Sequence, residues 1–200
     1  KKNVNHTEGR ILTLEISEKV AKIDWYHTLN FGNGVTTPGQ FDHGAILDRY
    51  NLQKSYTGKR ILDVATFDGF WAFEFEKRGA DEVIALDVNG PSDCDFLPSR
   101  KAVATESELA IVFGEGFELA RKQFDSNVTR VICNIYDLSA EKFGLFDVVH
   151  AGDFLVHLNS PVKALQNIAA VCTEYALISE VYFPELDIIG ERSLAAYHGG

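Results

Sequence analysis

Five short, continuously apolar runs alternate with segments of helical periodicity over residues 60–181, and this alternation restricts the fold most strongly. Continuous apolar runs bounded by turn residues are typical of strands that are buried on both faces. Because parallel strands are joined by right-handed crossovers, the sequence predicts an α/β, doubly wound, mostly parallel sheet. The predicted strands are Arg60–Ala65, Glu82–Asp87, Val128–Cys133, Phe146–Ala151 and Tyr175–Val181.

Apolar spacing also predicts the helices between these strands. We expect a helix over Phe70–Lys77, ended by Arg78-Gly79, and one helix over the apolar positions from Leu109 to Phe124. Ser160-Pro161 predicts the start of another helix, as its N-cap and first-turn proline. The expected inner face of that last helix consists of Val162, Leu165, Ile168, Ala169 and Cys172.

Residues 1–57 precede this pattern and are predicted to form a helical, lid-like segment on a core at 58–200, within one compact domain. Helices are expected over 12–24 and 45–50. The turn residues at 30–39 predict an ordered loop.

Charge and cysteine content exclude several classes of protein. Residues 61–200 carry ten Lys or Arg against 23 Asp or Glu, which disfavours a large nucleic-acid footprint there. No apolar stretch reaches the roughly 18 residues of a membrane span. The three cysteines form no CxxC pair, which excludes a disulfide scaffold and a four-cysteine zinc site, and we expect a reducing cytoplasm. The histidines show no H-x-x-x-H spacing, so no metal is expected.

The turn after the first predicted strand disfavours a dinucleotide cofactor. A G-x-G-x-x-G loop lets backbone amides approach a pyrophosphate, but its three glycine positions here are Ala65, Phe67 and Phe70. NAD and FAD are therefore disfavoured. A nucleoside cofactor without phosphates does not need that cradle.

Polar residues at the predicted strand ends suit such a nucleoside. Asp87 is placed to accept both ribose hydroxyls, or alternatively caps a turn. Asp63 is expected to orient the turn or hold an ammonium group, with a purely structural carboxylate as the alternative. Asn134 is a candidate for the adenine amino group, with Ile135 against the ring, unless Asn134 is an ordinary loop residue.

The ordered series Asp63…Gly69, Asp87, Asn134-Ile135 and Phe146-Asp147-Val148-Val149 resembles the motifs of class I S-adenosylmethionine (SAM) methyltransferases. The resemblance implies a Rossmann-like fold with SAM as cofactor. The first motif departs from the family pattern, because Ala65 and Phe67 replace two glycines. We expect Ala65 to keep a negative φ and the Phe67 ring to turn toward residues 37–39 or to cover the cofactor. The implied cofactor-binding residues are Asp63, Ala65, Thr66, Phe67, Gly69, Asp87, Val88, Asn134, Ile135 and Ala151.

A narrower resemblance extends from about Trp25 to Gly200. It is carried by segments such as Val35-Thr36-Thr37-Pro38-Gly39, Asp68–Glu74 and His157-Leu158-Asn159-Ser160-Pro161. These resemble tRNA wobble-uridine (5-hydroxyuridine) methyltransferases and carboxymethyltransferases, which implies tRNA as a possible partner. It also implies a lid with substrate-side residues at Trp25, His27, Thr37, Pro38, Gly39 and His43.

Two differences from this narrower family bear on function. The carboxymethyl-transferring enzymes have a tyrosine before the histidine that matches His157, and Val156 stands there in this chain. Valine offers no hydrogen-bond donor, so SAM is a better expectation than carboxy-SAM. The family also continues past the position of Gly200, so we expect the chain to lack the C-terminal strands.

His157 is the candidate catalytic residue, either as a base or as a group that orients the acceptor, unless it hydrogen-bonds within its own loop. His150 is expected to be a satisfied core histidine, and Asp153 is a candidate partner of either histidine. Trp25 and Trp71 are predicted to fill the core rather than to stack on a base. The leading function is methyl transfer to oxygen or nitrogen, on wobble uridine or on a small molecule. The alternative is a non-catalytic SAM- or nucleoside-binding protein.

Overall fold

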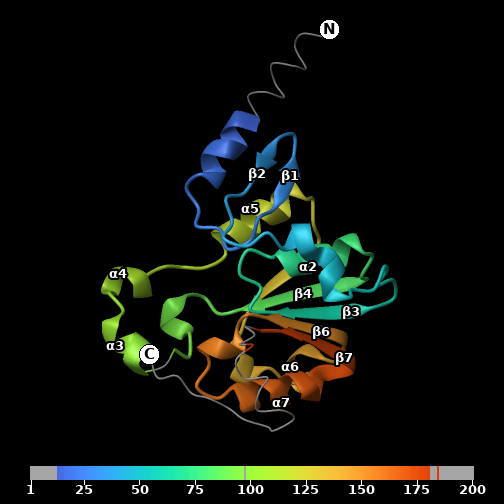
Figure 1. The fold of residues 1–200 in the computed structure, drawn as a ribbon. Coiled ribbons are helices and arrows are strands. Elements are labelled where there is room, and N and C mark those ends of the chain that lie inside the picture. The colour runs from blue at the N-terminus through green and yellow to red at the C-terminus, as the bar shows by residue number, and fades with distance from the viewer. Residues whose placement is uncertain (1–12, 97, 181–183, 185–200) are drawn as a thin grey trace.

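The computed structural model describes residues 13–96, 98–180 and 184, and among these a five-stranded parallel sheet forms the centre (Figure 1). Its strand order is β5-β4-β3-β6-β7. Helices α2 and α5 lie on one side of the sheet, and α6 and α7 lie on the other. The predicted α/β, doubly wound, parallel sheet is confirmed. The strands are β3 (Arg60–Val64), β4 (Glu82–Asp87), β5 (Thr129–Ile132), β6 (Phe146–Gly152) and β7 (Cys172–Ser179).

The order of the strands reverses between β3 and β6. From β3 the chain proceeds through β4 to β5 at one edge, and it then returns to place β6 and β7 on the other side of β3. Val64 is paired with Leu86 on β4 and with Ala151 on β6, so three carboxyl ends meet at the same place. In open α/β sheets, ligands bind at such a reversal point.

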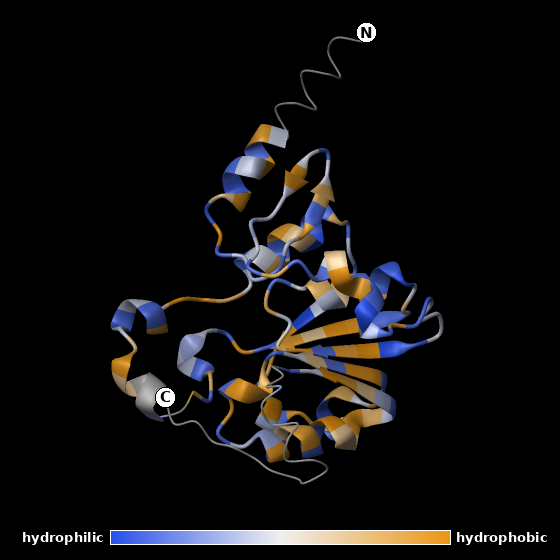
Figure 2. Ribbon diagram, viewed as in Figure 1, coloured by the Kyte–Doolittle hydropathy of each residue, from blue (hydrophilic) through white to orange (hydrophobic). Residues whose placement is uncertain are grey.

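Two apolar clusters cover the two faces of the sheet, because the central strands β3, β4 and β6 are largely buried on both sides (Figure 2). One cluster joins Ile61 and Val83 to α2 (Phe70–Lys77) and α5 (Glu115–Gln123). The other joins Leu62 and Val149 to α7 (Pro161–Val171). Both faces are therefore buried, as the continuous apolar runs predict.

The helix expected over Leu109–Phe124 is two helices, which corrects that prediction. α4 (Glu106–Leu109) has a capping box formed by Thr105 and Glu108, and α5 begins only after Gly114. Gly114 has a φ of 109°, a left-handed conformation that interrupts a helix and that glycine adopts readily. Helical periodicity alone does not reveal this interruption.

α7 begins at Pro161 after Ser160, as predicted, but most of its expected inner face is wrong. Ile168 is buried, whereas Val162 and Leu165 are 63% and 38% exposed. The buried face includes Ala164, Asn167 and Val171 instead, because the Asn167 side chain donates to the carbonyl groups of Ile135 and Tyr136. The helix also ends directly in β7, which begins three residues earlier than predicted.

The N-terminal segment packs on the same side of the sheet as α2. Its first helix is described over 13–20 and ends earlier than the expected residue 24. The loop expected at 30–39 contains a short antiparallel hairpin of β1 (Asn30–Gly32) and β2 (Val35–Thr36), a second correction. The 3-10 helix η1 spans His43–Tyr50. The remaining short elements are η2 (Pro91–Asp93), α3 (Pro98–Val103), η3 (Ile135–Asp137), α6 (Ala140–Phe143) and η4 (Leu155–His157).

Within the described part of the chain, no helix is long and apolar enough to cross a membrane. The end of the last predicted strand, at Val181, lies outside the described residues.

Candidate functional site

A cavity of about 310 Å³ lies where the carboxyl ends of β3, β4 and β6 meet, and we call it the strand-end cavity. The N-terminal segment contributes Tyr26 and His27 to its wall. Its volume lies at the lower end of the range for small-molecule pockets, roughly 300–1,000 Å³. The predicted site residues that line it are Asp63, Ala65, Phe67, Asp87, Val88, Asn134, Ile135, His27 and His157.

The turn between β3 and α2 has the positive φ angles that are typical of a glycine-rich loop, although only one of its three left-handed residues is a glycine. Ala65, Phe67 and Gly69 have φ values of 57°, 47° and 89°, all in the left-handed region. The negative φ expected for Ala65 is therefore wrong. Left-handed backbone costs an L-residue roughly 1–2 kcal/mol, so the surrounding structure must hold this turn in place.

Gly69 is the one position in the turn where a side chain would not fit. A Cβ atom built there would lie 2.5 Å from the Phe73 ring and 2.7 Å from the Phe117 ring. Gly69 itself does not line the strand-end cavity, and neither does the buried Thr66. Gly69 and Thr66 therefore belong to the turn but do not face the cavity.

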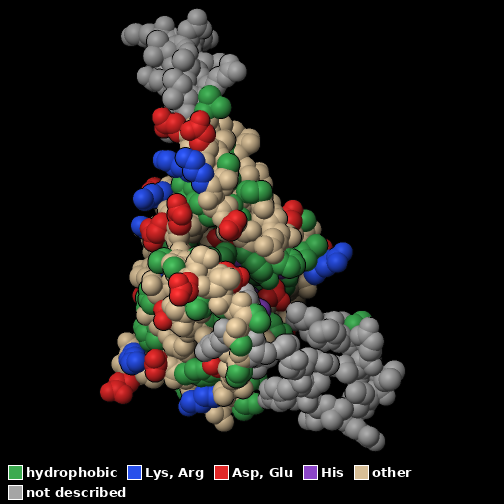
Figure 3. Space-filling view, turned by 90° about the vertical axis from the view of Figure 1, so that its left-hand side faces the viewer, with side chains coloured by type: hydrophobic (Ala, Val, Ile, Leu, Met, Phe, Trp, Pro, Cys, Tyr) green, Lys and Arg blue, Asp and Glu red, His purple; other side chains and the backbone are tan. Residues whose placement is uncertain are grey.

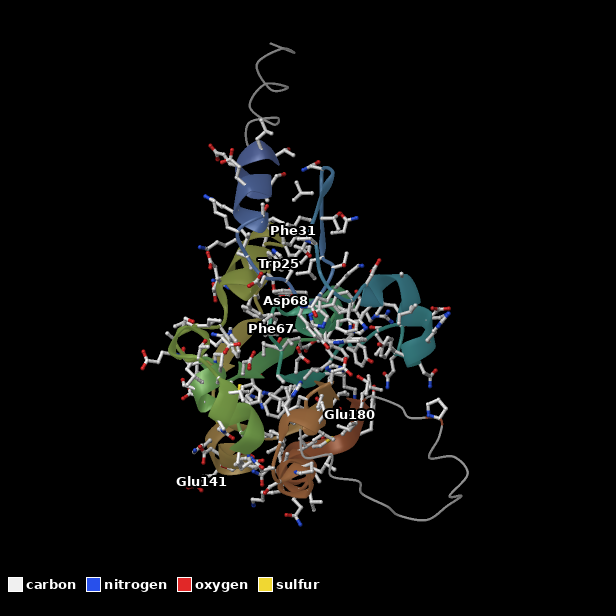
Figure 4. All side chains as sticks on the ribbon, turned by 60° about the vertical axis from the view of Figure 1, so that its left-hand side comes forward. Trp25, Phe31, Phe67, Asp68, Glu141 and Glu180 are labelled. Atoms are coloured by element: carbon white, nitrogen blue, oxygen red, sulfur yellow. The ribbon has the colours of Figure 1, made fainter. Side chains whose placement is uncertain are left out.

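Phe67 forms part of the cavity wall. Its ring packs edge-on against Tyr26 and Phe113, with ring centroids 6.1 and 5.3 Å away. We expected the ring either to turn toward residues 37–39 or to cover the cofactor, and in the structure it lines the cavity where the cofactor is expected. Figure 4 shows Phe67 next to Asp68, below Trp25 and Phe31 of the N-terminal segment.

Asp87 holds the turn from the neighbouring strand. One carboxylate oxygen accepts the backbone N–H of Phe67 at 2.9 Å, and the other accepts that of Val88 at 2.8 Å. Burial raises the pKa of Asp87 to about 6, while these two backbone hydrogen bonds act in the opposite direction. Each oxygen keeps a further lone pair for a hydroxyl donor in the cavity.

Asp63 on β3 and His150 on β6 are paired residues of adjacent strands. The Nδ1 of His150 lies 2.7 Å from the Oδ1 of Asp63, and both side chains are 1% exposed. His150 is thus buried, as predicted, but its Nε2 has no partner among the described residues, and the same is true of the Oδ2 of Asp63. Both residues line the strand-end cavity. His150 is therefore a core histidine, as predicted, and Asp63 satisfies its Nδ1.

Asn134 and Ile135 lie after β5, at the floor of the cavity. Asn134 caps η3 by accepting the backbone N–H of Tyr136 at 3.0 Å, and its amide donates to the carbonyl of Asp93 at 3.3 Å. Both side-chain hydrogen bonds of Asn134 are made to the backbone of nearby loops, as expected for the alternative in which Asn134 is an ordinary loop residue. Ile135 is buried and lines the cavity. Ala151 is buried within β6 and does not line it.

Asp68 fixes the N-terminal segment to the turn. Its Oδ2 accepts the backbone N–H groups of Tyr26 and His27 at 2.9 and 2.8 Å, and its Oδ1 pairs with the Nδ1 of His27. His27 also stacks on Phe70, with centroids 5.4 Å apart. The predicted lid is therefore attached to the candidate cofactor turn through a buried carboxylate.

The other predicted lid residues do not line the strand-end cavity. Trp25 is buried and donates to the carbonyl of Val20 at 3.0 Å, which confirms its core role. Thr37 joins the carbonyl of His27 to the N–H of Leu29. Pro38 is exposed, and a side chain at Gly39 would overlap the His27 backbone.

His43 lies behind the cavity wall, where its Nδ1 is 2.8 Å from the hydroxyl oxygen of Tyr50. Burial lowers the pKa of this imidazole. Trp71 is buried as predicted, packs on His43 and His150, and also lines the cavity.

His157 lies in η4 at the cavity rim, next to Phe96. Its imidazole forms no hydrogen bond to another described residue, so the alternative of bonding within its own loop is not what the structure has. Val156 is 50% exposed and does not line the cavity.

Sequence reasoning missed Tyr26 and Phe113, and it treated Asp153 only as a partner for a histidine. The Tyr26 hydroxyl donates to the Oδ2 of Asp153 at 3.4 Å, across the cavity mouth. Burial and the Asp153 charge raise the pKa of Tyr26 to about 12. Asp153 has a φ of 51°, a strained conformation that follows β6 directly. Asp153 could have been predicted as a site residue, because it comes just after the predicted strand Phe146–Ala151, which is β6 in the structure.

The described residues that line the strand-end cavity include five aspartates and no Lys or Arg. Such a lining favours a cationic or neutral ligand over an anionic one. In the part of the chain that the structure describes, no group of three or more His, Cys, Asp or Glu could hold a metal ion. Cys94, Cys133 and Cys172 form no disulfide with one another.

No protein-family model matches the chain, and no curated protein matches it in sequence. Among solved structures, it is similar to the N-terminal domain of EvdMO1 with SAH bound, at 19% identity and a TM-score of 0.55. That match covers 84% of this chain and 63% of that domain, and a second structure of the domain, in the presence of SAH and D-fucose, gives the same values. A putative methyltransferase from Bacillus halodurans C-125 is also similar, at 20% identity and a TM-score of 0.46, over 74% of this chain and 54% of its own.

The match to the EvdMO1 domain and the strand order confirm the expected Rossmann-like α/β fold. The chain spans less than two thirds of that domain's length. None of these proteins is described as a tRNA wobble-uridine enzyme, so the narrower resemblance stays a prediction.

Proposed function

We propose that the strand-end cavity binds SAM and that the chain is a SAM-dependent methyltransferase acting on an oxygen or nitrogen acceptor. The observation that carries this proposal is the left-handed turn at residues 65–69, held by Asp87 at the point where strand order reverses. The Rossmann-like fold shared with an SAH-bound domain supports the same ligand class.

The cavity fits the chemistry of this cofactor. Asp87 would accept the ribose hydroxyls, and Ile135 would pack against the adenine ring. The absence of Lys and Arg from the described lining suits a sulfonium cation and disfavours the extra carboxylate of carboxy-SAM. SAM supplies an activated methyl group on sulfur when bound. The residues that line the cavity would contribute orientation and exclusion of water.

Phe67 and Tyr26 would exclude water from the reacting centre, since both rings cover the cavity. His157 is the candidate to accept the acceptor's proton, because its imidazole lies at the rim and forms no hydrogen bond to a described residue. Asp153, held by Tyr26, would orient the acceptor beside it. In this arrangement the lid attached through Asp68 completes the site.

For the acceptor, we favour a small neutral or amine-bearing molecule over wobble uridine in tRNA. Asp93, Asp95 and Asp153 line the cavity, and phosphate groups are repelled by such a lining. On the face that Figure 3 shows, acidic side chains are interspersed with Lys and Arg. A cytoplasmic location, expected from the three widely spaced cysteines, belongs to the same proposal.

The test uses SAM labelled with tritium in its methyl group, incubated with a small-molecule extract and, separately, with unmodified tRNA. Label is expected in the small-molecule fraction, with His157→Ala reducing the rate. Label in tRNA would instead support the wobble-uridine alternative. SAH binding without transfer to either pool would favour the non-catalytic binding protein.

A further inference from the structure

Asn159 joins two loops that contribute to the wall of the strand-end cavity. The first is the 93–96 loop at the end of η2, and all four of its residues line the cavity. The second is the 155–160 loop, which contains η4 and the candidate base His157. Asn159 itself does not line the cavity, so any effect that it has on the site must come through these loops.

The side-chain amide of Asn159 donates to three oxygen atoms of the 93–96 loop. Its Nδ2 lies 2.9 Å from the Oδ1 of Asp95, 3.0 Å from the Asp95 carbonyl oxygen and 3.2 Å from the Phe96 carbonyl oxygen. Carbonyl oxygens and an ionised carboxylate only accept hydrogen bonds, so the amide must present its nitrogen to them. The backbone N–H of Asn159 adds a fourth bond, to the Oδ2 of Asp95 at 2.9 Å.

Tyr136 connects both loops to the sheet. It belongs to η3, which follows β5. Its hydroxyl donates to the Oδ2 of Asp95 at 2.6 Å and accepts the backbone N–H of Ser160 at 3.1 Å. Burial raises the pKa of this hydroxyl, so it remains a donor at neutral pH. The two loops therefore share one hydroxyl group as well as the Asn159 amide.

The loop that carries His157 is held on both sides of that residue. Before it, one carboxylate oxygen of Glu180 accepts the two backbone N–H groups at the start of η4, at 3.1 and 2.8 Å. After it, Asn159 makes its four bonds to the 93–96 loop. The backbone of His157 is thus fixed between two anchors, one of which is Asn159.

The His157 imidazole is oriented by the same contacts. It forms no hydrogen bond to another described residue, and its ring lies edge-on to Phe96, with centroids 6.3 Å apart and planes at 87°. Asn159 binds the carbonyl of Phe96 and lies two residues after His157 in the chain. It therefore holds both the imidazole and the ring that packs beside it.

We propose that Asn159 is a positioning residue for methyl transfer, which holds the His157 imidazole at the cavity rim through Asp95 and the Phe96 backbone. The inference rests on the proposed function, in which His157 takes the acceptor's proton. In that step the acceptor's electron pair forms the bond to the methyl carbon, the carbon–sulfur bond breaks toward sulfur, and the proton goes to an imidazole nitrogen. A general base must come within about 2.6–3.2 Å of the atom that loses the proton. A displacement of about 1 Å can cost roughly 100-fold in rate.

The test is a double-mutant cycle on the rate of tritium transfer from methyl-labelled SAM into whichever pool the wild type labels, small molecules or tRNA. Asn159→Ala should lower the wild-type rate by about tenfold, because the base is displaced rather than removed. In the His157→Ala background the same substitution should change the rate by less than about twofold, since no imidazole is left to position. Calorimetry should find the affinity for SAH changed by less than about twofold, since the cofactor contacts remain.

Asn127→Ala is the matched control. Asn127 is also an exposed asparagine, but it precedes β5, at the end of the sheet away from the cavity, and its side chain forms no hydrogen bond to another described residue. Its substitution should leave the rate unchanged. Tyr136→Phe provides a second route if Asn159→Ala fails to fold, because it removes the hydroxyl that both loops share. It should lower the rate in the wild type and not in the His157→Ala background.

An equal loss of rate in both backgrounds would overturn the positioning role, since the contacts would then stabilise the cavity wall without acting through His157. A wild-type rate in Asn159→Ala, or in His157→Ala, would overturn it as well. If the wild type binds SAH but labels neither pool, methyl transfer itself fails and the positioning role fails with it. Transfer by the wild type with an additive cycle overturns the role of Asn159 alone, so the two failures are distinguishable.

Discussion

Asp87 has two roles at the scale of single residues, since its carboxylate closes the backbone turn and is also our candidate acceptor for ribose hydroxyls. Burial raises its pKa to about 6. The ionised form is the acceptor, so SAH affinity should be full above pH 6 and fall as the pH drops below 6, by up to about tenfold per pH unit. Calorimetry between pH 5 and pH 8 measures this.

Asp87→Asn tests whether this carboxylate is the titrating group. The variant should bind SAH more weakly at pH 8 and lose the part of the pH dependence centred near 6. A wild-type affinity that is flat across this range would show that the carboxylate does not contact the ligand. For folding the sign is opposite: because the pKa is raised, Asp87 favours the folded state most below about 3.8, and this contribution is lost as the pH rises to about 6.

Phe67 tests whether the turn is held in a left-handed conformation. Glycine and alanine both remove the ring contacts with Tyr26 and Phe113, but at a φ of 47° alanine keeps the steric cost. Phe67→Gly should therefore be more stable than Phe67→Ala by about 1 kcal/mol in chemical denaturation. The opposite order would mean that the turn relaxes to a negative φ once the ring is removed.

At the scale of elements, the attachment of the N-terminal segment depends on Asp68. Asp68→Ala leaves the N–H groups of Tyr26 and His27 without their acceptor and breaks the His27 pair, so residues 24–41 should open more readily. Loss of about 1–3 kcal/mol of protection corresponds to amide exchange there that is roughly 5- to 160-fold faster. Hydrogen exchange with peptide-level readout measures it.

Asp81→Ala is the matched control for this exchange experiment. Asp81 also accepts a backbone N–H, from Gly58 at 2.8 Å, but in an exposed position away from the segment. Exchange over residues 24–41 should be unchanged in this variant. If Asp68→Ala left the same exchange rates as the wild type, the apolar contacts of Trp25 and Leu29 would suffice to hold the segment.

The central strands of the sheet could be predicted because β3, β4 and β6 are largely apolar on both faces, and Glu82–Asp87 has the bounds expected for it. The face of α7 could not be predicted, because Asn167 is buried by hydrogen bonds to carbonyl groups of a distant loop. The interruption before α5 depends on the φ of Gly114, which apolar spacing does not reveal.

The same limit applies to the candidate site. Asp63, Asp87 and Asn134 could be predicted because they follow or end predicted strands, and the topology of a parallel sheet brings such strand ends together. Tyr26 reaches the cavity only through the backbone bonds made by Asp68, a tertiary contact with no local signal. The unpartnered Nε2 of His150 likewise depends on the cross-strand register.

At the scale of the whole molecule, the net charge of −10 bears on the acceptor. We expect tRNA to bind no more tightly than non-specific nucleic-acid contacts do, with a Kd of roughly 10⁻⁴–10⁻⁶ M or weaker at physiological salt. Filter binding at several salt concentrations measures this. Tighter binding with a steep loss of affinity on adding salt would contradict the small-molecule acceptor and support wobble uridine.

The central claim is that the strand-end cavity binds SAM, and calorimetric titration of the folded chain with SAH tests it most directly. We predict one binding site per chain in the wild type. Asp87→Ala should weaken binding by about 1.5–3 kcal/mol, the range for hydrogen bonds to a charged group. No heat at millimolar SAH, or an Asp87→Ala variant that folds and binds SAH as tightly as the wild type, would contradict the account.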